Sequence, residues 1–112
     1  MTTPLRDADR LRHMLEAARK AVAFARGHGR ADLDADEQLT LSLVHLLEII
    51  GEAAGKVSPD FRQQHPEIPW TRVSGIRNRL IHGYFDIDLD IVWETTTTRL
   101  PELIAQLTPL TA

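Results

Sequence analysis

Apolar residues recur every three or four positions along four stretches of the chain, which is the period of amphipathic helices. This pattern predicts four helices. The first covers about residues 6–26, and the second runs from a cap at Asp34 or Asp36 to about residue 57. The third starts at about Pro69, and the fourth covers about residues 88–107. No stretch alternates for long enough to predict a strand. The predicted inward-facing residues are Leu11, Met14, Leu15, Ala18, Val22 and Ala25; Leu39, Leu43, Leu46, Ile50, Ala53 and Val57; Trp70, Val73, Ile76 or Arg77, and Leu80; and Val92, Thr96, Leu100, Leu103 and Leu107.

Glycine and proline set the limits of these helices. Gly27 follows the first helix and begins the loop GHGRADLDAD, and Gly83 is expected to end the third helix. Ser58 and Pro59 are favourable residues for capping and starting a short helix to about residue 64, which HPEIP then breaks. Pro101 predicts a kink or a restart in the last helix, because proline removes a backbone donor and clashes with the preceding turn.

The second predicted helix is apolar over most of its circumference. Its apolar stripe is widened by Leu41, Val44, Leu47 and Ala54. We therefore expect it at the centre of the fold, in contact with its own bundle and with a second subunit. Gly51 would let another helix approach closely, and Glu52 is either solvated or in contact with a functional cleft. Short loops between these elements predict a single all-α domain, residues 1–112, built as an antiparallel four- to five-helix bundle.

Composition excludes several classes of protein. The chain has no cysteine, which excludes disulfides and thiolate metal sites. No apolar run approaches the roughly 18 residues that suggest a membrane span, and the charged start MTTPLRDADRLRHML does not resemble a secretory signal. We therefore expect a cytoplasmic protein.

Positive charge is concentrated in one segment of an acidic chain. The net charge is −3, yet residues 68–85 contain three arginines and no acidic residue. Such a segment would attract a polyanion locally while the rest of the chain repels it. A solvated helix face explains three arginines equally well.

That segment contains RNRLIHGYF, which places Arg77, Asn78, Arg79, His82 and Tyr84 together. In a continuous helix, Asn78 and Arg79 would be neighbours of His82. Arg77 would lie about 140° away from His82, so these two would meet only if the last turn unwinds, if the arginine wraps inward, or across a twofold axis.

Histidine and arginine together have the chemistry to cleave RNA without a metal. An imidazole accepts the proton of a ribose 2′-OH, which attacks the adjacent phosphorus, and a guanidinium stabilises the charge on the phosphorane. DNA lacks the 2′-OH and would not be cut. Taken singly, His82 could instead favour a helix C-terminus, Arg77 could form a salt bridge, and Tyr84 could be a half-buried aromatic residue.

Longer stretches around this cluster resemble a known family. IPWTRVSGIRNRLIHGYFDID, preceded by LLEIIGEAAGKVS and followed by VWETTTTRLPELIAQL, resembles the HepT-like toxins of the HEPN superfamily over nearly the whole chain. The family's R-x4-H-x-Y motif matches Arg77, His82 and Tyr84, and Asn78 follows the arginine.

This resemblance implies a homodimeric ribonuclease that needs no metal or other cofactor and whose two motifs line a shared cleft. It implies His82 as the base, Arg77 as the residue that binds the scissile phosphate, and Asn78 as an orienting residue, with Arg79 contacting RNA. It also implies a partner, an MntA-like minimal nucleotidyltransferase. That antitoxin would silence the toxin by attaching AMP to Tyr84, as in a type VII-like toxin-antitoxin system.

Two other classes of function are compatible with the residues. His13 with Glu16, and His45 with Glu48, place possible metal ligands on two helices, but the order is the reverse of the Glu-x-x-His found in di-metal bundles. The third helix contributes no acidic ligand. A non-catalytic dimer that binds RNA, a nucleotide or a nucleotidyltransferase partner would need the arginines but not His82.

Overall fold

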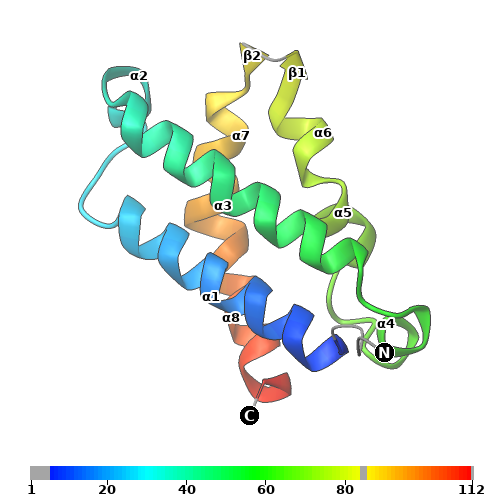
Figure 1. Cartoon of the computed structure of the whole chain (residues 1–112). Coiled ribbons are helices and arrows are strands. Elements are labelled where there is room, and N and C mark those ends of the chain that lie inside the picture. The colour runs from blue at the N-terminus through cyan, green and yellow to red at the C-terminus, as the bar shows by residue number, and fades with distance from the viewer. Residues whose placement is uncertain (1–5, 84–85, 112) are drawn as a thin grey trace, which may run out of the picture.

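The computed structural model describes residues 6–83 and 86–111, and this part of the chain is mostly helical (Figure 1). Two long helices, α1 (Asp7–Ala25) and α3 (Glu37–Gly55), are connected through the short α2 (Asp32–Ala35). Three short helices follow: α4 (Pro59–Gln64), α5 (Trp70–Ser74) and α6 (Ile76–Leu80). An antiparallel hairpin of β1 (Ile81–Gly83) and β2 (Asp86–Ile87) leads into α7 (Leu89–Glu94), the π-helical turn η1 (Thr95–Arg99), α8 (Leu100–Leu107) and the 3₁₀ turn η2 (Thr108–Leu110).

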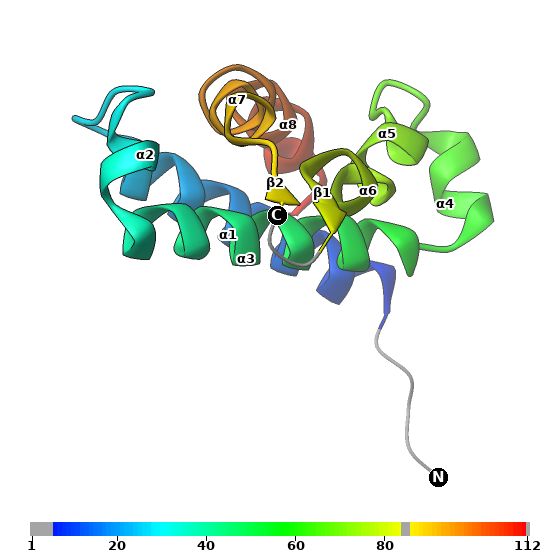
Figure 2. The ribbon, with the colours of Figure 1, turned by 90° about the horizontal axis from the view of Figure 1, so that it is seen from above.

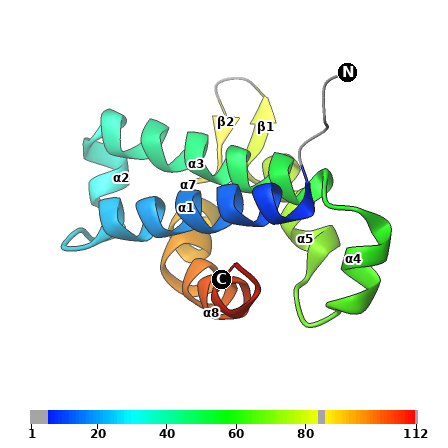
Figure 3. The ribbon, with the colours of Figure 1, turned by 60° about the horizontal axis from the view of Figure 1, so that its bottom comes forward.

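The helices form two layers. In Figure 2, α1 and α3 form one layer, and α5, α6, α7 and α8 cover one of its faces. Figure 3 shows α8 beside α1 and the hairpin extending beyond α3. α3 contacts α1, α2, α5, α6 and α7, so its predicted central position is confirmed. The opposite face of the α1–α3 layer is not covered by the part of the chain that the structure describes.

The core contains almost all of the residues predicted to face inward. All of them are buried except Val22, which is half-buried, and of the two alternatives Ile76 and Arg77 the buried one is Ile76. Leu41, predicted to widen the apolar surface of α3, is 51% exposed, whereas Val44, Leu47 and Ala54 are buried. Gly51 is buried where α5 and α6 cross α3, and a Cβ placed there would lie 2.8 Å from Cγ2 of Ile76. The expected close approach of another helix is confirmed.

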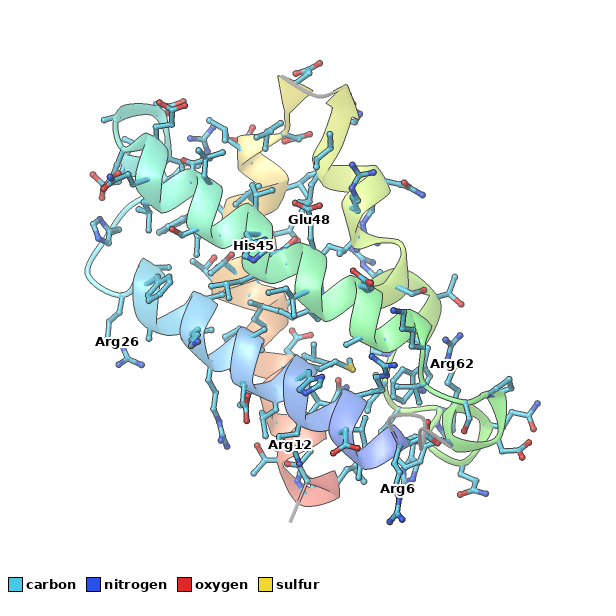
Figure 4. All side chains as sticks on the ribbon, viewed as in Figure 1. Arg6, Arg12, Arg26, His45, Glu48 and Arg62 are labelled. Atoms are coloured by element: carbon cyan, nitrogen blue, oxygen red, sulfur yellow. The ribbon has the colours of Figure 1, made fainter. Side chains whose placement is uncertain are left out.

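Polar side chains cap the helices where the sequence predicts. The carboxylate of Asp36 accepts a hydrogen bond from Leu39 N–H at the start of α3, and Ser58 Oγ accepts one from Phe61 N–H at the start of α4. Gly27, just after α1, has a φ of +82°, a conformation that other residues rarely adopt. Arg62 donates to the carbonyl oxygens of Ala54 and Gly55 and so satisfies the last turn of α3 (Figure 4).

The third helix differs from the prediction. It is interrupted at Gly75, which separates α5 from α6, and it ends at Leu80 instead of Gly83. Ile81 is already extended and is paired with Ile87, and Asp88 N–H donates to the carbonyl oxygen of Leu80 at 2.7 Å. The expectation of no strand was therefore wrong, because a hairpin of five described residues is too short to show a period in the sequence. The predicted loop before α3 also contains the one-turn helix α2.

The last helix is continuous in direction but widens before Pro101. The N–H of Leu100 donates to the carbonyl oxygen of Thr95, an i to i+5 bond that defines the π turn η1. Proline at position 101 lacks an N–H and would clash with the carbonyl four residues earlier in a regular helix, and the wider turn relieves this clash. The predicted disturbance at Pro101 is thus a π turn. Among the described residues, no helix is both long and apolar enough to cross a membrane.

Candidate functional site

Arg77 projects from α6 toward the central helix. Its Nε donates to Oε2 of Glu48 on α3 at 3.2 Å. The arginine side chain is 65% exposed, so solvent reaches its remaining N–H groups and a phosphate would too. Figure 4 shows Glu48 on the side of α3 that faces α6. The ion pair holds the guanidinium at a defined place without burying it.

His82 lies on β1, immediately after α6. Its Nε2 is 3.8 Å from Oδ2 of Asp88, which is too long for a hydrogen bond but close enough for electrostatic attraction to a protonated ring. The histidine side chain is 53% exposed. The other carboxylate oxygen of Asp88 accepts a hydrogen bond from Ile91 N–H and caps α7. This cap fixes the carboxylate beside the imidazole.

The end of α6 at Leu80 changes the predicted relations around His82. Asn78 and Arg79 are not helical neighbours of His82, because that relation requires a helix extending through residue 82. The chain leaves the helix at Leu80, between Arg77 and His82, so these two side chains are not fixed about 140° apart around one helix. Asn78 is exposed on α6. Tyr84, the expected acceptor of AMP, lies outside the described residues.

Arg79 lies away from this site. Its guanidinium donates to the carbonyl oxygen of Arg72 at 2.9 Å, on the face of α6 turned toward α5 and α7. Partial burial, followed by the nearby positive charges of Arg72 and Arg99, lowers the pKa of Arg79. The arginines of the positive segment are therefore divided between two faces of the molecule.

Glu48 and Asp88 lie beside the candidate residues Arg77 and His82, and the sequence pattern did not indicate either contact. Glu48 was noted only as a possible metal ligand with His45, and Asp88 only as the start of a helix. The spacing of residues along the chain does not indicate these two contacts. Glu48 lies 29 positions before Arg77, and Asp88 comes near His82 only because β1 pairs with β2.

The histidines on the two long helices do not gather ligands for a metal. His13 and Glu16 border a shallow hollow that also contains Lys20, a cation unsuited to a metal site. Glu48 turns to Arg77 instead of joining His45. Within residues 6–83 and 86–111, no group of three or more His, Asp or Glu side chains is placed to hold a metal ion.

A known protein family matches most of the chain. The family described as "Ribonuclease HepT-like" matches residues 14–110. The chain belongs to the HepT-like ribonuclease family. The match begins inside α1 and includes α6, the hairpin and α8, so Glu48, Arg77, His82 and Asp88 all lie within the matched residues.

Relatives of this HepT-like chain carry ribonuclease names. A "Putative RNase" of Caldanaerobacter subterraneus is 38% identical over 96 residues, which cover 86% of each chain. A "Probable ribonuclease HepT" of Thermococcus cleftensis is 36% identical over 95 residues, 85% of this chain and 86% of that one. A "Putative RNase" of Methanocaldococcus jannaschii is 32% identical over 90 residues, 80% and 83% of the two chains. No solved structure matches the chain.

Proposed function

We propose that this HepT-like chain is a metal-independent endoribonuclease in which His82 and Arg77 act on the scissile phosphate. The observation that carries the proposal is that both side chains stay exposed while a carboxylate from another element lies beside each, Glu48 at 3.2 Å from Arg77 and Asp88 at 3.8 Å from His82. The ribonuclease names of the relatives are consistent with RNA as the substrate.

The reaction follows from the two side chains. Neutral His82 accepts the proton of a ribose 2′-OH, and the 2′ oxygen attacks the adjacent phosphorus and displaces the 5′ oxygen of the next nucleotide. The displaced oxygen takes up a proton, which leaves a 2′,3′-cyclic phosphate and a 5′-hydroxyl. Arg77 binds the nonbridging oxygens and stabilises the charge that they gain. General acid-base catalysis of this type contributes about 10² to 10⁴-fold.

The surrounding residues prepare this pair for the reaction. Asp88 stabilises the imidazolium that forms when His82 accepts the proton, and Glu48 holds the guanidinium of Arg77. Asn78, exposed on α6 between them in sequence, orients the histidine or the RNA. Arg79 contacts RNA beyond the reaction centre.

The active enzyme is a homodimer whose two sites share one cleft. The uncovered face of α3 carries a stripe of exposed or half-buried residues at helical spacing, Leu41, His45, Glu48 and Glu52. Leu41 at 51% exposure would be buried by a second copy on this face, and Glu48 connects the stripe to Arg77. Packing of two such faces supports a cleft with one Arg77 and one His82 from each subunit.

In the cell the ribonuclease acts as the toxin of a toxin-antitoxin pair. An MntA-like nucleotidyltransferase silences it by transferring AMP to Tyr84, two residues after His82. Added nucleotides bring bulk and negative charge to the place where an RNA phosphate must bind, so they exclude the substrate.

The test is cleavage of mixed RNA by the purified chain in the presence of a metal chelator. We expect cleavage that yields 2′,3′-cyclic phosphate ends, falls by about 10²-fold or more in His82→Ala, and is absent on DNA of the same sequence. Arg77→Ala should lose cleavage similarly. Sedimentation or light scattering should report a dimer for every variant.

Matched controls separate a chemical role from a general loss of charge. His28→Ala removes another exposed histidine beside a carboxylate, Asp32, and Arg12→Ala removes another exposed arginine in an ion pair, with Asp9. Both should cut at the wild-type rate. A His82→Ala variant that cuts as well as His28→Ala would refute the role of His82. No cleavage by the wild type, with RNA still bound, would identify a non-catalytic binding module instead.

A further inference from the structure

A cavity of about 300 Å³ lies between two groups of helices, α5 with α6 and α7 with α8. Figure 2 shows these groups side by side on the same face of α3. Arg79 lines the cavity, whereas Arg77, two positions earlier and about 200° round the helix, turns to Glu48. Neither Arg77 nor His82 is among its lining residues, so the cavity is separate from the proposed cleavage site.

The walls of the cavity are aliphatic. Its apolar floor and sides are formed by Ile50, Val73, Ile76, Ile91, Leu100 and Leu103. All of these are buried except Ile91, which is half-buried, so the walls are part of the rigid core. None of the lining residues is aromatic. Such walls suit an apolar body of a few carbon atoms better than a nucleobase, whose polar edge would find few partners there.

The rim of the cavity carries an excess of positive charge. Arg72, Arg79 and Arg99 line it together with the two carboxylates Glu94 and Glu102. Arg99 pairs with both glutamates, at 3.3 Å and 3.9 Å. Among the described residues, Arg72 and Arg79 have no carboxylate within 4.0 Å.

Arg79 and Arg72 are held next to each other despite their like charge. The guanidinium of Arg79 donates to the carbonyl oxygen of Arg72 at 2.9 Å, which fixes its place at the rim. Burial, and then the charges of Arg72 and Arg99, lower the pKa of Arg79 against a smaller opposing effect of Glu94, so Arg79 lies close enough to both arginines to be repelled by them. An anion between Arg72 and Arg79 would offset this repulsion and accept hydrogen bonds from their guanidinium N–H groups.

The π turn η1 supplies a second and independent feature of the cavity. Thr95 and Arg99, its first and last residues, both line the cavity. The turn exists because Pro101 prevents a regular helix, and it carries Arg99 to the rim. π turns of this kind are frequent at functional sites, although each one weakens the helix that contains it.

We propose that this cavity binds a small amphipathic anion, with an aliphatic body against the buried walls and a carboxylate or phosphate head between Arg72 and Arg79. This site goes beyond the proposed ribonuclease activity. Its volume is at the lower end of ligand pockets in proteins, which limits the body to a short chain or a single ring.

The test titrates the isotope-labelled full chain with octanoate and with octyl phosphate, below the concentrations at which they aggregate. The methyl signals of Ile91 and Leu103 should shift saturably in NMR spectra. The tighter of the two probes identifies the head group. Octanol, which has the same body without the charge, should bind at least about tenfold more weakly, the equivalent of 1.4 kcal/mol.

Three variants make the test specific. Arg72→Gln removes an exposed charge from the rim and should weaken binding about tenfold, whereas Arg19→Gln removes an exposed arginine from α1 and should leave it unchanged. Ile91→Trp fills the cavity from its half-buried edge and should abolish binding, with circular dichroism verifying the fold. No saturable shift with either anion, equal binding by Arg72→Gln and the wild type, or binding of AMP in place of both probes would overturn the proposal.

Discussion

The Nε atom of Arg77 lies 3.2 Å from Oε2 of Glu48, and this contact joins the short helix α6 to the long central helix α3 across 29 positions of sequence. The pair is exposed, with 65% of the arginine side chain and 36% of the glutamate side chain open to solvent. An exposed pair contributes little to folding, and the role we propose for this pair is to place the guanidinium.

Glu48→Gln should therefore separate positioning from stability. The amide still accepts a hydrogen bond from Arg77 but carries no charge. We expect RNA cleavage to fall about tenfold, less than in Arg77→Ala, while the free energy of unfolding changes by no more than about 1 kcal/mol. Glu16→Gln, which removes a carboxylate 3.9 Å from Arg12 on α1, is the control and should cut normally. Unchanged cleavage in Glu48→Gln would show that the pair does not position Arg77.

Asp88→Asn should separate the two roles of that carboxylate. Asparagine keeps the cap on Ile91 N–H, but its neutral side chain does not stabilise an imidazolium at His82. We expect the free energy of unfolding to stay within about 0.5 kcal/mol of wild type and cleavage to fall about tenfold. Asp88→Ala, which also loses the cap, should unfold about 1 kcal/mol more easily. If Asp88→Asn cuts at the wild-type rate, the carboxylate serves only as a cap.

Tyr84→Phe should keep cleavage but escape silencing. Phenylalanine lacks the hydroxyl that would accept AMP, and the proposed reaction does not use that hydroxyl. Incubation with an MntA-like nucleotidyltransferase and ATP should add AMP to the wild type, as measured by mass spectrometry, and should leave the variant unmodified and active. AMP found on Tyr84→Phe would place the acceptor elsewhere.

Gly51→Ala should destabilise the fold although alanine favours helices. Its Cβ would lie 2.8 Å from Cγ2 of Ile76 and 3.1 Å from the carbonyl oxygen of Val73. We expect a loss of about 1 to 3 kcal/mol in denaturant unfolding, because overpacking outweighs the gain in helix propensity of about 1 kcal/mol. Gly55→Ala on the same helix meets only Ser74 Cβ, at 3.8 Å, and should be neutral or slightly stabilising. Equal stability of the two variants would mean that α5 and α6 can shift away.

The long helices were predictable because their periods extend over many turns. The stripes of α1, α3 and the last helix have enough residues for the apolar face to be recognised, and the residues named from them form the core. Caps at Asp36 and Ser58 were predictable because each acts on backbone N–H groups within three residues. The short elements α2, β1 and β2 and the break between α5 and α6 were not, since one turn, two paired residues or a single glycine leave no period to detect.

The sequence by itself determined the helical core, the order of its helices and the set of polar residues from Arg77 to Tyr84, because each depends on the character and spacing of neighbouring side chains. Only the tertiary structure decided which carboxylates lie beside Arg77 and His82. It also decided that α6 ends before His82, and that Arg79 lines a cavity while Arg77 turns to Glu48. Those relations depend on contacts between segments that are distant in sequence and on the residue at which α6 ends. The packing of α5, α6 and α7 against α3 determines the contacts and the end of the helix.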